Sequence, residues 1–138
     1  MVLRKVYGVA NNILAKTKYV SDLVRLSLIE SYVFPVMMYG LEAIDLVKSQ
    51  MRELSVCVNN IYRRIFNMNR WESVKLIQFF CGRLDFISMC HLRKLKFLCN
   101  LSQSDNPVIF ECLWRFKQTE MFYNLLAEYQ IPDEKPQY

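Results

Sequence analysis

Basic side chains are the residues of this 138-residue sequence whose type and spacing best suit a chemical role. Residues 1–100 contain 15 Lys and Arg against 7 Asp and Glu, and residues 52–96 contain nine basic residues against three acidic ones. Such side chains bind the phosphates of a nucleic-acid backbone without reading its sequence. The alternative is an ordinary solvated surface. We predict a nucleic-acid-binding surface that comprises Arg63, Arg64, Arg70, Trp71, Lys75, Arg83, Arg93, Lys94 and Lys96.

Trp71 is the one aromatic residue in this set, and it follows Arg70 directly. An indole ring beside a cation can stack on a base or a sugar. The competing interpretation is a partly buried anchor beneath a loop, which is the more common role of a tryptophan. Both interpretations remain open from the sequence.

The acidic residues and the single histidine do not form a catalytic pattern. A polymerase site holds two metal ions with paired carboxylates, but the sequence has no Asp-Asp pair and its aspartates fall in different predicted elements. His91 has no obvious Ser, Cys or Asp partner arrangement, and three glycines in all leave no phosphate-cradling loop. We predict no catalytic residue, no cofactor and no enzymatic activity for the isolated chain.

The five cysteines are odd in number and widely spaced, without a Cys-x-x-Cys pair. A disulfide framework requires an oxidising compartment, and a zinc site normally shows closely spaced ligands. We therefore predict no metal site, and cysteines that are small buried apolar residues in a reducing, intracellular compartment. The sequence does not distinguish the nucleus from the cytoplasm.

Helices must position these side chains. Apolar residues recur at three- and four-residue intervals, most clearly at Met51, Leu54, Val58, Ile61 and Ile65. The expected fold class is all-α, a compact bundle of about five to seven helices, kinked or broken near Pro35 because proline removes a backbone donor. The expected helices cover residues 2–16, 21–40 with that break, 50–67, 73–80, 84–101 and 108–129, the last interrupted near Gln118-Thr119.

Several residues mark the expected ends and faces of these helices. Ser21 is the expected N-cap of the second helix, with Leu23 on its buried side and Arg25 and Glu30 facing out. Gly40 and Gly82 are suited to the position after a helix end. The longest apolar run is interrupted by Pro35, Gly40, Glu42 and Asp45, so no membrane span is expected.

Short motifs in the same order resemble the segment after the palm in reverse transcriptases of non-LTR (LINE-type, jockey-like) retrotransposons. The principal one is Ser31-Tyr32, then Pro35, then Tyr39-Gly40-Leu41-Glu42-Ala43. Later matches are Ser49-Gln50, Asn59-Asn60, Arg63-Arg64-Ile65-Phe66, Trp71-Glu72-Ser73-Val74 and Gly82-Arg83-Leu84. The resemblance covers residues 6–101, and none of its motifs is catalytic.

The resemblance implies a single helical thumb-like domain over residues 1–128, with a C-terminal tail over 129–138. A thumb holds an RNA–DNA or RNA template–primer duplex by shape and backbone contacts. Fingers and palm are missing, so we expect a fragment of a transposable element, or a truncated reading frame, that does not catalyse. A palm domain is a further expected partner.

The alternative is a helical protein-interaction module, or an inactive remnant, with no nucleic-acid role. Apolar surface left exposed would then promote self-association. A thumb requires its basic side chains on one contiguous face, whereas an interaction module would scatter them and expose an apolar patch.

Overall fold

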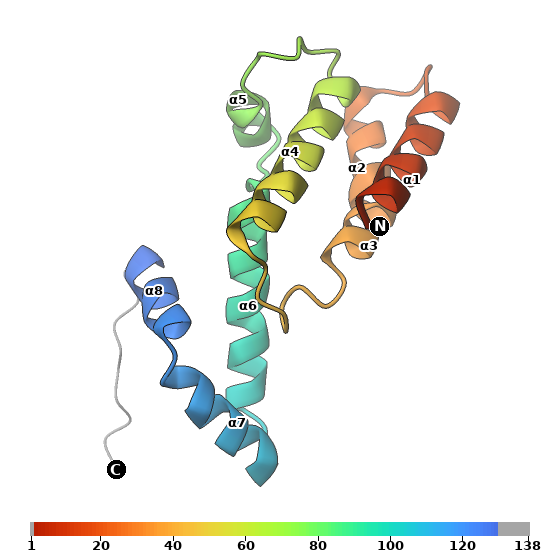
Figure 1. Cartoon of the computed structure of the whole chain (residues 1–138). Coiled ribbons are helices and arrows are strands. Elements are labelled where there is room, and N and C mark those ends of the chain that lie inside the picture. Colours follow the sequence, from red (N-terminus) through yellow and green to blue (C-terminus); the bar gives the residue numbers. More distant parts are fainter. Residues whose placement is uncertain (1, 130–138) are drawn as a thin grey trace. The chain divides into compact units, whose positions relative to one another are not determined.

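The computed structural model describes residues 2–129 of the chain, and every regular element in that part is an α-helix (Figure 1). The predicted all-α class is therefore confirmed. Counting α2 and α3 as the two halves of one broken helix gives seven helices among the described residues. The elements are α1 Val2–Lys16, α2 Asp22–Tyr32, α3 Phe34–Met38, α4 Lys48–Ile65, α5 Lys75–Phe80, α6 Phe86–Ser102, α7 Pro107–Lys117 and α8 Glu120–Tyr129.

The chain divides into two compact units, residues 1–92 and residues 93–138, with the division inside α6. The expected tail covers residues 129–138, of which 130–138 lie outside the described residues. Among the residues whose burial the structure describes, all but one of the buried apolar side chains belong to the first unit, and the other is Leu113 in the second unit.

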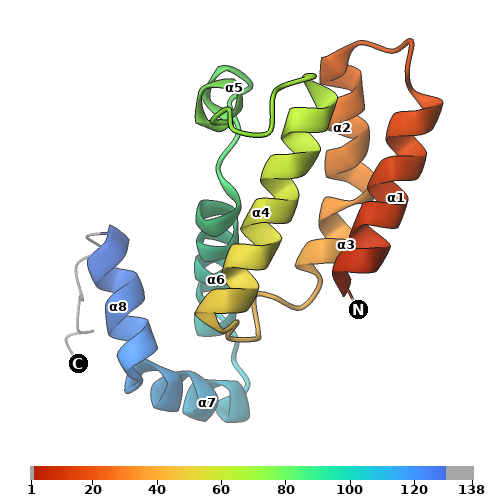
Figure 2. The same ribbon diagram turned by 45° about the horizontal axis from the view of Figure 1, so that its top comes forward.

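The core of the first unit lies between α1, the α2–α3 pair and α4, which lie side by side (Figures 1 and 2). The three- and four-residue spacing of apolar side chains gives each helix one buried stripe. Val74, just before α5, and Phe86 and Cys90, from the first turns of α6, complete the cluster. Its fully buried members include Val6, Ala10, Ile29, Val33, Cys57, Val58 and Phe86.

The break near Pro35 occurs as predicted. Helix α2 ends at Tyr32, and Pro35 lies in the first turn of α3, where the missing N–H leaves no helical hydrogen bond unmade. After α3 the chain turns through Tyr39 (φ −60°, ψ 120°) and Gly40 (φ +75°), and the Leu41 N–H donates to the Met38 carbonyl at 3.2 Å. This is a type II turn, which requires a positive φ at its third residue.

Most predicted helix ends are confirmed within two residues. Gly82 follows α5 with φ +64°, and the Arg83 N–H donates to the Gln78 carbonyl at 2.8 Å. Helix α4 begins at Lys48, before the predicted residue 50, because the Gln50 side chain accepts the Val47 N–H. Ser21 precedes α2 as predicted, but its side chain makes no capping hydrogen bond.

Three predictions about exposure were wrong. Leu23 is 63% exposed, whereas Arg25 and Glu30 are only partly exposed because each binds a partner from another segment. Arg25 donates to the Ile65 carbonyl at the end of α4, 3.1 Å away, and Glu30 binds Arg83. Cysteine burial was predicted correctly only in part: Cys57 and Cys90 are buried and Cys81 is half-buried, but Cys99 and Cys112 are exposed.

The second unit comprises the end of α6 together with α7 and α8. Asn106 caps α7 by accepting the Val108 N–H at 2.9 Å, and the predicted interruption falls between Lys117 and Glu120. Phe116 of α7 meets Phe122 of α8 edge to face, with ring centroids 5.9 Å apart.

Candidate nucleic-acid interface

Helices α1 and α4 run side by side in the same direction, although 31 residues separate the end of one from the start of the other (Figure 1). Asn60 donates to the Tyr7 hydroxyl at 3.4 Å, and one turn further along Arg64 donates to Asn11. The two hydrogen bonds share the same sequence offset, as expected for parallel helices in register. They fix which side chains line the seam between the helices.

Three adjoining hollows follow this seam, and together they form what we call the α1–α4 groove. Tyr7 lines both the first and the second hollow, and Arg64 lines both the second and the third. The second has a volume of ≈ 620 Å³. Between Lys48 and Arg64 helix α4 rises about 24 Å, equivalent to about seven nucleotides of one strand in a duplex.

The groove is strongly basic. Its polar lining includes seven cationic side chains, and Glu53 is the only acidic residue among the described residues that line it. A concave surface lined by one sign of charge concentrates counter-ions of the opposite sign. The cationic residues are Lys18, Arg25, Lys48, Arg52, Arg63, Arg64 and Arg70.

Three of the predicted residues, Arg63, Arg64 and Arg70, line the same hollow at the end of α4. Arg63 is half-buried, and its Nε donates to the Glu72 carbonyl at 3.0 Å while a terminal nitrogen donates to Asn60 at 3.1 Å. Arg63 therefore holds the following loop against α4. Arg64 and Arg70 are exposed to solvent and can turn toward an anion.

Residues 66–74 connect α4 to α5 and carry Trp71. Asn67, the second residue of this loop, has φ +51°, and the Met68 N–H donates to the Arg63 carbonyl at 2.8 Å, closing the end of α4. Trp71 is 84% exposed. The structure thus contradicts the interpretation of Trp71 as a buried anchor and leaves its ring available for contact.

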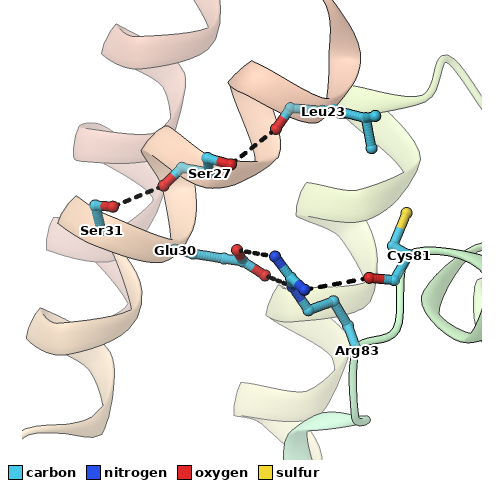
Figure 3. Close-up of polar contacts among 6 residues, drawn as sticks. All are labelled: Leu23, Ser27, Glu30, Ser31, Cys81 and Arg83. Atoms are coloured by element: carbon cyan, nitrogen blue, oxygen red, sulfur yellow. Dashed lines mark hydrogen bonds and ion pairs between the residues drawn. The ribbon is translucent and has the colours of Figure 1, made fainter.

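Lys75 and Arg83 flank α5, and their surroundings differ. Lys75, at the start of α5, is exposed. The guanidinium of Arg83 is bound by the Glu30 carboxylate and also donates to the Cys81 carbonyl at 3.2 Å (Figure 3). The charge of Arg83 is therefore engaged within the first unit.

The remaining predicted residues, Arg93, Lys94 and Lys96, belong to the second unit. Arg93 and Lys96 are exposed. Lys94 is 7% exposed, and its Nζ lies 5.8 Å from the centroid of the Phe116 ring. A cation over an aromatic face is an attractive pair, so Lys94 packs within its own unit.

The prediction missed four cations of the groove, and one of them carried a usable signal. Leu3, Tyr7, Asn11 and Leu14 follow one another at helical spacing on the face of α1 that lines the groove. Lys18 comes four residues after Leu14, in the turn that follows the end of α1, and also lines the groove. Lys48 and Arg52 line the groove because α1 packs on α4, whereas Arg25, on α2, lines it because α2 packs against both of these helices. Neither packing arrangement has a local signal.

Two weakly acidic side chains lie in and beside the groove: Tyr7 lines it, and Cys57 neighbours Tyr7. Burial raises the pKa of the Tyr7 hydroxyl and of the neighbouring Cys57 thiol, so both stay protonated near neutral pH. Within the part of the chain that the structure describes, no group of three His, Cys, Asp or Glu residues is placed to hold a metal ion. What the groove offers is a row of hydrogen-bond donors and positive charges.

Among the described helices, none is both long enough and apolar enough to cross a bilayer. Comparison of the chain with protein-family models, with curated proteins and with solved structures found no match. Proposals about function therefore depend on the groove and on the motif resemblance.

Proposed function

We propose that this chain is a non-catalytic helical segment that binds nucleic acid by its backbone, related to the thumb region of non-LTR retrotransposon reverse transcriptases. The observation that carries the proposal is the α1–α4 groove, which is lined by seven cations and one carboxylate. The proposed ligand is an RNA–DNA or RNA template–primer duplex. Lys and Arg contacts of this kind position a strand without selecting its sequence.

Arg64 and Arg70 are the side chains best placed to contact phosphates. Both are exposed and line the same hollow, whereas Arg63, Arg25 and Arg83 hold other segments in place through carbonyl groups or a carboxylate. Replacing Arg64 and Arg70 removes positive charge from the groove and breaks one exposed hydrogen bond between helices, from Arg64 to Asn11, so circular dichroism of the variant must first show an unchanged helix content.

The testing experiment compares charge reversals inside and outside the groove. The double variant Arg64→Glu/Arg70→Glu is titrated with an RNA–DNA hybrid at low salt. The control is a second double variant of equal net charge, Lys5→Glu/Lys16→Glu, at two exposed residues of α1 that do not line the groove. Lys5 is two residues from Leu3 and Lys16 is two residues from Leu14, so both lie about 200° around α1 from the groove side. The proposal requires the affinity of the groove variant for the hybrid to fall about tenfold or more. An equal fall in the affinity of the control variant would mean that net charge alone, and not the groove, accounts for binding.

A specific observation favours a second candidate, a protein-interaction module. Helix α5 exposes three large apolar side chains: Leu76 is 69% exposed, Phe79 is 78% exposed and Phe80 is 79% exposed. Large apolar side chains gathered on one short helix are typical of an interaction site. Sedimentation of the wild-type chain and of Phe79→Ser/Phe80→Ser would show a difference in association state if α5 mediates self-association.

A further inference from the structure

Trp71 is held in an exposed position by the structure around it. The Arg63 side chain binds the carbonyl of Glu72, the residue directly after Trp71. The Glu72 N–H in turn donates to the Asn69 carbonyl at 3.1 Å, and the Asn69 and Glu72 side chains are hydrogen-bonded to each other. The backbone on both sides of Trp71 is thus fixed while the indole ring stays 84% exposed.

Trp71 directly follows a residue of the α1–α4 groove. That residue, Arg70, lines the hollow at the end of α4 that Arg63 and Arg64 also line. The residues on either side of the indole are polar, and Asn69 and Arg70 are exposed. An exposed indole is therefore attached to the backbone beside an exposed arginine of the groove, a combination that suits a ligand with phosphates and flat aromatic groups.

We propose that Trp71 stacks on an unpaired base of a strand whose phosphates lie in the α1–α4 groove. This inference rests on the proposed nucleic-acid function and narrows it to a ligand class: nucleic acid with single-stranded bases beside the bound backbone. In continuous duplex each base face is covered by its neighbours, so an indole from a loop reaches a base only where pairing has ended. Stacking of this kind is tolerant of sequence because every base has a π-face.

The experiment uses the whole chain and fluorescence. The sequence has two tryptophans, and Trp114→Phe leaves Trp71 as the only indole. This protein is titrated with a short single-stranded oligonucleotide, with an abasic strand of the same length and phosphate number, and with a blunt continuous duplex. If Trp71 stacks on a base, the single strand should quench the fluorescence of Trp71. The abasic strand should then bind with an affinity at least about fivefold lower than that of the normal single strand.

Variants at position 71 separate stacking from charge. Trp71→Ala lowers affinity for the single strand about fivefold or more and leaves affinity for the abasic strand unchanged, whereas Trp71→Phe retains most of the binding. Because the ring is exposed, neither variant should alter helix content, which circular dichroism checks. The dependence on the base is the readout that a merely structural role would not give.

The possible failures are distinguishable. One failure is salt-dependent binding in which the abasic strand binds as tightly as the normal strand, Trp71→Ala has no effect and the tryptophan fluorescence is not quenched. This result would overturn the stacking proposal and leave backbone binding intact. No binding of any oligonucleotide by the folded chain would overturn both. Quenching by anionic lipid vesicles but by no oligonucleotide would assign the exposed ring to a membrane surface and reject the proposal.

Discussion

The Glu30 carboxylate binds the Arg83 guanidinium through both of its oxygens, 53 residues apart in sequence (Figure 3). One of these contacts measures 2.9 Å between Nη2 and Oε2, and the Arg83 Nη1 also donates to the Cys81 carbonyl. The pair fastens the segment after α5 to helix α2. Because Arg83 contacts both Glu30 and Cys81, its side chain serves the fold of the first unit. Hydrogen bonding to Glu30 also raises the pKa of Arg83.

Removing this pair should lower stability by a modest amount. Arg83→Gln leaves Glu30, whose side chain is 22% exposed, without its partner, and we expect a loss of about 1 kcal/mol in the free energy of unfolding. Urea denaturation of Arg83→Gln, Glu30→Gln and the double variant measures the coupling. The control is Arg115→Gln, whose ion pair with Glu111 within α7 is much more exposed and should contribute about 0.3–0.5 kcal/mol. Equal losses at both pairs would contradict this account.

Two phenylalanine substitutions should differ in their effect on stability by several kcal/mol. Phe86 is 0% exposed in the core of the first unit, whereas Phe79 is 78% exposed. Phe86→Ala should lower the free energy of unfolding by about 3–5 kcal/mol, because it leaves a cavity. Phe79→Ala should lower it by about 0.5 kcal/mol or less. Thermal unfolding of both variants is the measurement. A tolerated Phe86→Ala would mean that the start of α6 does not pack as described.

Two glycine-to-alanine changes should have opposite signs. Gly8 is exposed within α1 and has no atom within 4 Å of the position that a Cβ would occupy, so alanine should stabilise the helix by about 0.5–1 kcal/mol. Gly82 has equally open surroundings but φ +64°, so Gly82→Ala should destabilise by about 1 kcal/mol. Urea denaturation of both variants and of the wild type gives the two changes in the free energy of unfolding. Stabilisation by Gly82→Ala would be inconsistent with a left-handed conformation there.

Tyr62 should make the fold sensitive to alkaline pH. Burial raises the pKa of its hydroxyl from 10.0 to about 12, with a further contribution from the nearby Glu30 carboxylate. Between these two values the unfolded chain releases the proton while the folded chain keeps it. The contribution of the Tyr62 hydroxyl to the free energy of unfolding is therefore fully present below pH 10 and is lost as the pH rises through 12. The total loss is about 2–3 kcal/mol.

The variant Tyr62→Phe isolates this effect. The Tyr62 hydroxyl is buried and makes no hydrogen bond among the described residues, so its removal should leave stability at pH 7 unchanged or slightly higher. Between pH 9 and pH 11 the variant should lose less stability than the wild type. Parallel pH profiles for the two proteins would contradict the assignment.

Local sequence signals predicted the helices and most of their ends. Pro35, Gly40 and Gly82 act through backbone geometry that depends only on nearby residues, and the apolar stripe of α4 follows from its spacing. Local spacing could not show that Glu30 meets Arg83 or that Arg25 reaches Ile65. Leu23 was misplaced for the same reason, because which flank of α2 is covered depends on where α1 and α4 pack.

The candidate site was predictable in part. Arg63, Arg64 and Arg70 cluster because they end one helix and begin the loop after it, which is a local relationship. Lys48 and Arg52 join them through the parallel packing of α1 on α4, and Lys94 was misjudged because its burial against Phe116 depends on α7 folding back toward α6 within the second unit. Charge counts along a sequence do not reveal such burial.

The most direct test of the central claim is binding of the purified, monodisperse chain to a short RNA–DNA hybrid across a salt series. If Arg64, Arg70 and Lys18 contact about three phosphates, log K should fall with log salt at a slope of about −2 to −3. The Arg64→Glu/Arg70→Glu variant should bind more weakly with a shallower slope. A folded chain that does not bind at low salt, or binds without salt dependence, would contradict the proposal that the α1–α4 groove holds a nucleic-acid backbone.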